Sequence, residues 1–291
     1  MKLGVIFAST GYATTAEGAT LLGQEAERLG YDSVWTVEHV VVPADYGSKY
    51  PYNSSGKMAG GDDATIPDPL VWLTWVGART ERILLGTGVL ILPEHNPVVL
   101  AKELATLDSF CPGRVRLGAG IGWLREEFEV IGVPFEERVA RMEESIEVLR
   151  AFWSMDQPSF HGRFWNFDDA RMWPKPASRR IPVIVGGHGE NAARRAARLG
   201  DGFFPANSDL DEIDTVVRVC REEAERLGRD PASIEITAGT RPEPANIERF
   251  LRLGVDRVVV PAFSMDGEQM KDALGRKMAA FEAAAGEAAR A

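Results

Sequence analysis

Short apolar runs alternate with amphipathic helical runs along the whole chain, and this alternation limits the fold more than any other feature. Most apolar runs are too short and too continuously apolar to be one-sided antiparallel strands, in which polar and apolar residues alternate. The strands that we expect are Leu3–Ala8, Asp32–Thr36, Ile83–Val89, Val115–Gly120, Pro182–Gly186, Gly202–Pro205, Ile234–Ala238 and Val258–Pro261. Between them apolar residues recur at intervals of three and four, as from Phe135 to Trp153, which is typical of helices with one buried face.

Eight strand–helix units in 291 residues predict a closed (β/α)8 TIM barrel. A doubly wound parallel sheet is the alternative, but regular units without a second block of different composition favour closure. We therefore expect a single domain spanning residues 1–291. Two long segments interrupt the regularity: Val40–Pro67 after the second strand, and Ser154–Arg180 between the fourth helix and the fifth strand. Segments of this length are usually lids or insertions that carry function.

Composition excludes several classes of protein. The net charge is −10, and no Lys/Arg run occurs, so nucleic acid and anionic membranes are poor partners. The cysteines, Cys111 and Cys220, are far apart, which predicts neither a disulfide framework nor a zinc site. The longest apolar stretch, Ile83–Leu92, is about half of the ~20 residues that a membrane helix needs. The first residues, MKLGVIFAST, read as a strand rather than a signal peptide, so we expect a cytoplasmic protein.

Histidines gather where the predicted strands end. In a barrel of this kind the active site lies at the carboxyl ends of the strands, and His39, His95 and His188 follow strands there. Glu38 and His39 form the best catalytic candidate, because a carboxylate near an imidazole favours its protonated form. Neighbours on an extended segment point to opposite sides, however, so the two side chains are free to serve different partners.

Two glycine clusters open predicted helices, at Gly118–Trp123 and at Gly186–Asn191. Glycines at such turns let backbone amides approach a phosphate, although tight strand–helix turns need glycine for packing as well. Arg125 or Arg194 is a candidate for the accompanying cation. Glu126 and Glu127 do not favour a phosphate and read as a solvated first helical turn.

A third glycine-containing stretch, Gly86–Leu90, reaches the expected mouth of the barrel. Glycine inside a strand usually marks a bulge or the close approach of a ligand. Aromatic residues crowd the mouth and the insertions, where they suit a planar apolar ligand; they are Tyr46, Tyr50, Tyr52, Trp72, Trp75, Trp123, Phe160, Phe164, Trp165 and Trp173, with Trp72 and Trp75 expected in the core. No H-E-x-x-H motif or comparable cluster of histidine and carboxylate is present, so we expect no metal. No nucleophile-elbow or Walker sequence is present either.

The chain resembles the bacterial luciferase-like flavin and deazaflavin oxidoreductases, nearly from end to end. The densest similarity runs from Leu85 to Trp153, and VWTVEHVVVP and IPVIVGGHGENAARRAARLGDGFFP are also typical of the family. Within it, the chain is most similar to the actinobacterial subgroup associated with coenzyme F420, an 8-hydroxy-5-deazaflavin. The resemblance implies a homodimer and a (β/α)8 barrel that binds a flavin-type ring at its mouth.

The resemblance also assigns residues to the expected site. It implies a non-prolyl cis peptide at Gly88–Val89 behind the ring, phosphate on the amides near Gly120–Trp123 and Gly187–His188, and Glu38 and His39 facing ring or substrate. The cofactor-binding residues that we expect are Thr87, Gly88, Val89, Gly120, Gly122, Trp123, Gly186, Gly187 and His188.

The chain departs from the family at two positions. Many deazaflavin relatives have Asp-His where this chain has Glu38-His39, and the sugar-phosphate dehydrogenase branch has an acidic residue near Trp123 that is absent here. Sugar-phosphate oxidation is therefore not carried over.

Three functions follow from these features. The first is hydride transfer between coenzyme F420 and a small organic substrate, with His39 handling the proton as a general acid or base. The second is an FMN-dependent monooxygenase, and the third is a flavin-binding protein without catalysis. The two long segments, Val40–Pro67 and Ser154–Arg180, are expected to select the substrate, and the aromatic content suggests one with an apolar or conjugated part.

Overall fold

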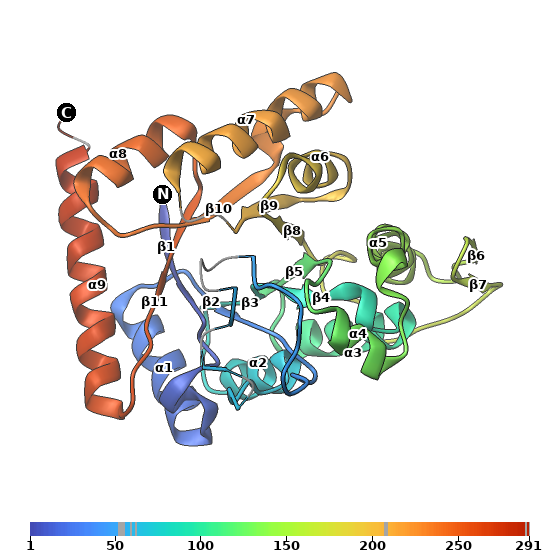
Figure 1. The fold of residues 1–291 in the computed structure, drawn as a ribbon, viewed down its shortest axis with the longest axis horizontal. Helices are drawn as coiled ribbons and strands as arrows, with labels where there is room; N and C mark the ends of the chain where they lie inside the picture. Colours follow the sequence, from blue (N-terminus) through green and yellow to red (C-terminus); the bar gives the residue numbers. More distant parts are fainter. Residues whose placement is uncertain (52–55, 59, 62, 207–208, 289, 291) are drawn as a thin grey trace.

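The computed structural model describes residues 1–51, 56–58, 60–61, 63–206, 209–288 and 290. Its parallel strands follow the order β3-β2-β1-β11-β10-β9-β8-β5-β4. Because β3, the first strand of this order, also pairs with β5, the sheet closes into an eight-stranded barrel. The strands are β1 (Lys2–Ile6), β2 (Ser33–Thr36), β3 (Leu84–Thr87), β4 (Leu90–Ile91), β5 (Val115–Gly120), β8 (Val183–Gly187), β9 (Gly202–Pro205), β10 (Glu235–Gly239) and β11 (Arg257–Pro261). The short strands β3 and β4 are two parts of the third barrel strand. The predicted (β/α)8 TIM barrel is confirmed (Figure 1).

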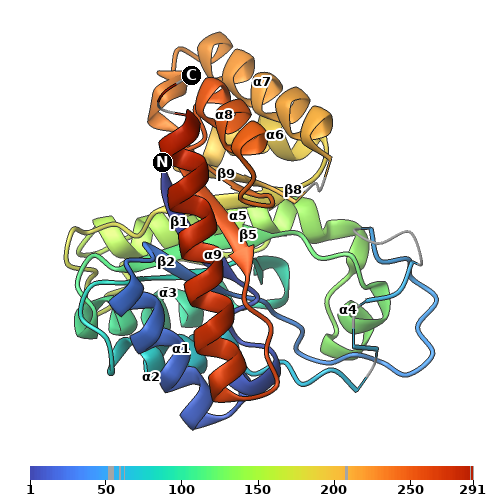
Figure 2. The ribbon, with the colours of Figure 1, turned by 90° about the vertical axis from the view of Figure 1, so that its left-hand side faces the viewer.

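Helices surround the barrel, and each strand leads into one of them. They are α1 (Ala16–Leu29), α2 (Pro69–Gly77), α3 (Pro97–Phe110), α5 (Arg138–Ser154), α6 (Glu190–Leu199), α7 (Leu210–Arg226), α8 (Pro244–Leu253) and α9 (Gly267–Ala288), with α4 (Arg125–Ile131) added between β5 and α5. Short 3-10 helices are η1 (Gly11–Thr14), η2 (Leu92–Glu94), η3 (Phe135–Glu137) and η4 (Pro231–Ser233). Figure 2 shows α9 running beside α1 on the outside of the barrel. No helix in the described part of the chain is long and apolar enough to cross a membrane.

Local sequence signals explain where helices begin and end. Asn96 begins α3 by accepting hydrogen bonds from the amides of Val98 and Val99, and Pro97 occupies the first turn, where a missing N–H costs nothing. Gly30 ends α1 with a φ of 91°, in the left-handed region that glycine adopts without strain.

The insertion from Ser154 to Arg180 forms a small antiparallel hairpin of β6 (Phe160–His161) and β7 (Asn166–Phe167). Its turn is held by Glu144 on α5, which accepts hydrogen bonds from the amides of Arg163, Phe164 and Trp165 at 2.8 to 2.9 Å. The hairpin projects from the outer side of α5, away from the barrel (Figure 1). The other insertion, Val40–Pro67, contains no helix or strand among its described residues.

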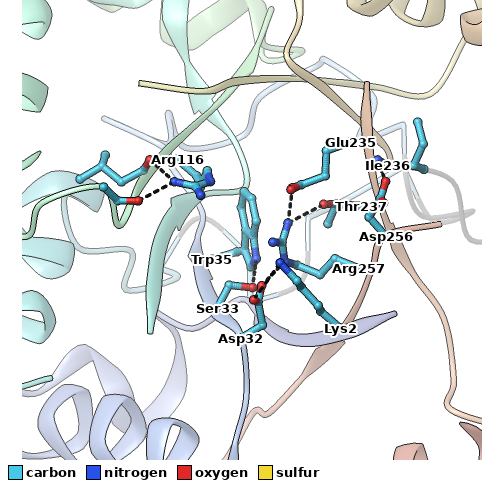
Figure 3. A network of polar contacts seen from close by, with 12 residues as sticks. Lys2, Asp32, Ser33, Trp35, Arg116, Glu235, Ile236, Thr237, Asp256 and Arg257 are labelled. Atoms are coloured by element: carbon cyan, nitrogen blue, oxygen red, sulfur yellow. Dashed lines mark hydrogen bonds and ion pairs between the residues drawn. The ribbon is translucent and has the colours of Figure 1, made fainter. Parts of the chain in front are cut away.

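A fully buried arginine closes the amino end of the barrel (Figure 3). The guanidinium of Arg257 donates to Asp32 at 2.6 Å, to Glu235, and to the hydroxyl of Thr237 at 3.1 Å. Burial alone would lower the pKa of Arg257, but attraction to Glu235 and Asp32 raises it above its ordinary value. The Trp35 ring lies 5.5 Å from the guanidinium. Because this ring and the ion cluster fill the amino end of the barrel, a ligand can enter only at the carboxyl end.

The third barrel strand is broken between β3 and β4, where the Gly88–Val89 peptide bond is cis, as the family resemblance implies. The Val89 side chain points across the barrel mouth toward two glycines. A Cβ at Gly120 would lie 2.5 Å from Val89 Cγ2, and one at Gly186 would lie 2.6 Å from Val89 Cγ1. These two glycines are therefore required to leave room for Val89.

We predict that Gly186→Ala lowers the free energy of unfolding by about 1–3 kcal/mol, because the added methyl overlaps the Val89 isopropyl group. Removing those methyls with Val89→Ala should relieve the overlap, giving a coupling free energy of about 1 kcal/mol between the two positions. Urea unfolding of both single variants and the double variant measures this. Gly189→Ala is the control, since a Cβ there meets no atom within 4 Å. Strict additivity would contradict the packing explanation.

Candidate active site

A cavity of about 1770 Å³ opens at the carboxyl ends of the barrel strands. Its walls include residues that directly follow strands, such as Val37, Gly122 and Ala206, together with Tyr50 and Ile66 from the long segment after β2. Ligand pockets are typically about 300–1,000 Å³, so this cavity has room for a cofactor and a substrate together.

All but one of the expected site residues line this cavity. Glu38, His39, Gly88, Val89, Gly120, Gly122, Trp123, Gly186, Gly187 and His188 do so. Thr87 does not; it is buried, and its hydroxyl donates to the carbonyl of Gly118 at 2.7 Å. Thr87 therefore ties β3 to β5 beneath the cavity.

The glycine clusters also serve packing directly. Gly122 has a φ of 75°, and a Cβ there would lie 2.6 Å from the Phe128 ring. Gly187 has a φ of 150°, and a Cβ there would lie 2.5 Å from the Ala192 methyl. Tight packing thus accounts for these glycines independently of any phosphate.

His39 is held from outside the cavity by a buried carboxylate. Its Nδ1 lies 2.7 Å from Oε2 of Glu127, whose side chain is fully buried. The imidazole meets the Trp123 ring edge-on, with the ring centres 5.7 Å apart. Because no described protein group hydrogen bonds to Nε2, this nitrogen is left for a ligand in the cavity. A carboxylate on one ring nitrogen fixes both the tautomer and the orientation of the other.

Glu126 and Glu127 lie in the first turn of α4, as expected, but the expectation that this turn is solvated is wrong, because Glu127 is fully buried and both carboxylates are hydrogen bonded. Glu127 accepts hydrogen bonds from the amides of Val40 at 2.6 Å and Val41 at 3.2 Å. Glu126 accepts from the amides of Gly47 and Ser48, and hydrogen bonding, first of all from the Ser48 hydroxyl, lowers the pKa of Glu126 to about 2. Both glutamates tie α4 to the long segment after β2. The local sequence does not show this role, because the partners lie more than 70 residues away.

Glu38 points away from His39, as expected for neighbours on an extended segment. Its carboxylate accepts from the Ile91 amide at 2.5 Å and lies 2.9 Å from Nε2 of His95. Burial would lower the pKa of His95, but the hydrogen bond and charge of Glu38 raise it above its ordinary value. Glu38 thus supports β4 and His95 behind the broken strand.

Glu94 is a third acid in this region. Both of its carboxyl oxygens are buried without a hydrogen-bond partner in the described part of the chain. Burial, and then the charges of Glu127 and Glu38, raise the pKa of Glu94 to about 9. At neutral pH Glu94 is therefore protonated, since three adjacent carboxylates cannot all be charged at low cost.

The cavity cations differ from those expected. Arg125 pairs with Glu136 and Arg194 with Glu190, and neither lines the cavity. Arg138 on α5 and Arg195 on α6 line it instead, together with Lys49 from the long segment after β2. The position of Arg195 between Ala192, Ala193, Ala196 and Ala197 on the buried face of α6 is the sequence signal that could have identified it.

The two arginines are incompletely paired. Arg195 is 7% exposed, and its Nε donates to Glu143 at 3.1 Å. Arg138 has a buried Nε without a partner among the described residues. Burial lowers the pKa of Arg138, and repulsion from Arg125 and, to a smaller extent, from Arg195 lowers it further. A cavity that gathers like charges in this way suits an anionic ligand.

The aromatic residues divide between the cavity and other regions. Tyr50 and Trp123 line the cavity, and Tyr46 packs on Trp123 at 5.6 Å, whereas Tyr52 lies outside the described residues. None of the residues lining the described cavity comes from Ser154–Arg180, so the expectation that this insertion shapes the site is wrong. Among the described residues, no cluster of His, Cys, Asp and Glu could hold a metal ion.

A family model for luciferase-like monooxygenases matches residues 1–246. The chain belongs to the luciferase-like monooxygenase family. An uncharacterised protein of Mycobacterium tuberculosis is 33% identical over 270 residues, covering 92% of this chain and 93% of its own length. An F420-dependent glucose-6-phosphate dehydrogenase of Segniliparus rotundus is 35% identical over 230 residues, or 75% of this chain and 63% of that protein.

Two solved structures illustrate the range of the fold. The monooxygenase RslO1 of Streptomyces bottropensis superposes with a TM-score of 0.76 at 22% identity, covering 97% of this chain and 99% of its own. The coenzyme F420-dependent tetrahydromethanopterin reductase of Methanopyrus kandleri has a TM-score of 0.74 at 17% identity, with coverage of 95% and 97%. Relatives and neighbours thus include F420-dependent enzymes and a monooxygenase.

We predict that Glu94→Gln becomes more stable than the wild type as the pH rises. Between the ordinary pKa of 4.5 and the folded value of about 9, the folded wild type keeps a proton that the unfolded chain has lost. Stability therefore falls with rising pH in this window, and glutamine removes the effect. Between pH 6 and pH 8.5 the variant should gain about 1–3 kcal/mol over the wild type in urea unfolding.

The control is Glu129→Gln on α4, whose side chain is exposed. It should follow the wild type at every pH. A constant difference between Glu94→Gln and the wild type across the window would show that Glu94 is charged in the folded protein.

Proposed function

We propose that the protein is an oxidoreductase that transfers a hydride between coenzyme F420 and a small organic substrate. The observation that carries this proposal is the placement of His39 in the cavity, with Nδ1 held by Glu127 and Nε2 available, beside the broken strand at Gly88–Val89. The F420-dependent glucose-6-phosphate dehydrogenases among the relatives support the choice of cofactor.

The cavity residues fit a flavin-type cofactor. Val89, supported by Gly120 and Gly186, provides an apolar surface for a planar ring at the mouth of the barrel. Arg138 and Arg195 would supply charge for a phosphate. Gly189 provides no side-chain cap for α6, so the first two amides of the helix, of Glu190 and Asn191, are available to the same anion. A bound deazaflavin would supply the hydride, and the protein would supply orientation and proton transfer.

His39 would act as the general acid or base at the substrate oxygen. Glu127 holds its Nδ1 and compensates the charge of the imidazolium form. Trp123 packs against the same imidazole and limits its rotation. Glu38, expected beside His39 as a catalytic residue, has both oxygens engaged, so we assign it a positioning role behind β4.

An FMN-dependent monooxygenase is the second candidate, favoured by the structural similarity to RslO1. The same cavity would accept either ring, so the two functions differ in cofactor preference and in oxygen use. The predicted homodimer and cytoplasmic location remain predictions from the sequence.

We predict that His39→Ala reduces turnover with F420 by about 100- to 10,000-fold, because a positioned general acid or base contributes about that much. The dissociation constant for F420 should hardly change, since the imidazole is assigned to the proton and not to cofactor binding. Stopped-flow absorbance of the deazaflavin and fluorescence titration measure the two quantities. His161→Ala is the control, because His161 is 65% exposed on the distant hairpin. Unchanged turnover in His39→Ala would remove His39 from the mechanism.

Cofactor choice is tested by titrating the purified protein with F420 and FMN while following quenching of tryptophan fluorescence. We predict a preference for F420. Arg195→Gln should weaken F420 and FMN by about 10- to 100-fold, because it removes a charged hydrogen bond to phosphate, and should leave riboflavin unchanged.

Arg198→Gln is the matched control, because Arg198 shares Glu143 as its partner but does not line the cavity. Preference for FMN would favour the monooxygenase, and oxygen uptake would then be measured. Equal weakening of FMN and riboflavin would mean that Arg195 supports the fold and not the phosphate.

A further inference from the structure

One wall of the cavity is apolar and partly exposed at its rim. Phe7 follows β1, and Phe263 and Met265 follow β11; their exposed fractions are 44%, 63% and 69%. All three line the cavity, so this surface is continuous with the site and is not a separate patch. We call these three residues the apolar rim. Exposed large apolar side chains of this kind at a cavity entrance usually mark a binding surface.

The threonines beside the rim have no hydroxyl hydrogen left for a ligand, and Ser264, between Phe263 and Met265, is buried and does not line the cavity. Thr10, Thr14 and Thr15 line the same wall, and their hydroxyls donate to the carbonyls of Phe7, Gly11 and Tyr12 at 2.7 to 2.9 Å. The Tyr12 ring lines this wall too, and burial, followed by the neighbouring Glu17 carboxylate, raises the pKa of Tyr12 above its ordinary value. This wall therefore presents methyl groups and aromatic carbon to the cavity, despite its content of hydroxyl residues.

The backbone at the rim is held in an uncommon conformation. Phe7 has a φ of 56°, in the left-handed region that bulky residues seldom adopt. The carbonyl of Phe7 accepts the Thr10 hydroxyl at 2.7 Å, and the following amide, of Ala8, donates to Trp35 at 3.0 Å. These bonds keep an aromatic ring at the cavity entrance, where it is 44% exposed. Strained residues held by their surroundings often lie at ligand sites.

The apolar rim lies opposite the cationic end of the cavity. In the closed barrel, three strands separate β1 from β8 in either direction, and the same holds for β11 and β5. Arg195 follows β8 and Arg138 follows β5, so these two arginines lie across the barrel from the rim. His39 follows β2, which pairs with β1, so it lies on the side of the rim.

We propose that the apolar rim binds the hydrocarbon part of an uncharged substrate, such as a secondary alcohol or ketone with an extended alkyl or aryl chain. The proposal rests on the hydride-transfer function above. An anion on the cofactor would occupy the end with Arg138 and Arg195, and the substrate oxygen would meet His39 Nε2. The chain of the substrate would then leave over Phe7, Phe263 and Met265. A sugar phosphate would find no Lys or Arg for its phosphate in residues 7–15 or 261–265, which form this wall.

The proposal is tested without turnover, by displacement of the neutral fluorescent probe N-phenyl-1-naphthylamine. Straight-chain 2-alkanols and 2-alkanones from four to ten carbons should displace the probe from the wild type, with affinity rising about fourfold per methylene. Phe263→Ser and Met265→Ser should each flatten this dependence and weaken the longest ligands at least tenfold. Both side chains are largely exposed, so the fold should survive these changes.

Phe110→Ser is the matched control, since Phe110 is 70% exposed at the end of α3 and does not line the cavity. It should leave the chain-length dependence unchanged. The proposal would be overturned if chain length had no effect on displacement of the probe from the wild type. It would also be overturned if glucose 6-phosphate displaced the probe more strongly than 2-decanol.

The same variants are titrated with F420. If F420 binds but chain length has no effect, the rim proposal fails alone. If neither F420 nor FMN binds the wild type, the proposed function fails, whatever the alcohols do.

Discussion

The break in the third barrel strand at Gly88–Val89 is the constraint around which the site is arranged. Val89 points into the mouth of the barrel. The next two strands around the barrel, β5 and β8, have glycine at Gly120 and Gly186, where a Cβ would overlap the Val89 side chain. Beneath the break, Thr87 ties β3 to β5, and behind it Glu38 binds the amide of Ile91 in β4. Gly120 and Gly186 are thus first of all a packing requirement of this one side chain, and space for a ligand is a second result of the same geometry.

Two His–Glu pairs follow from one extended segment. Glu38 and His39 are adjacent, and the backbone sends them to opposite sides, so Glu38 pairs with His95 behind the broken strand and His39 pairs with Glu127 at the cavity. Glu94 is kept neutral by its burial, and then by the charges of Glu127 and Glu38. Glu127 can therefore hold the His39 imidazole firmly. Because Glu94 stays protonated, Glu38, Glu94 and Glu127 do not place three negative charges together in the buried region.

The sequence predicted the barrel because each of its signals is local. Apolar runs, helical periodicity and glycine turns are all read within about ten residues, and the barrel strands lie within a few residues of the expected positions. His39 and the glycines were also predictable, since they follow strands. Glu127 was not, because its partners Val40 and Val41 are about 87 residues away and only folding brings α4 to that segment. The same reason applies to the cations. Arg138 lines the cavity from α5, whereas Arg125 lies on α4, and Arg195 differs from Arg194 only in the face of α6 that it occupies.

The hairpin of β6 and β7 has a practical consequence. It is anchored to the outer face of α5 through Glu144 and the stacking of Phe152 on Phe167, and it contributes nothing to the described cavity. Its tip projects away from the barrel in Figure 1. The exposed side chains of this hairpin, such as His161, are therefore places to attach a surface-immobilisation handle or a spectroscopic label at a distance from the cavity.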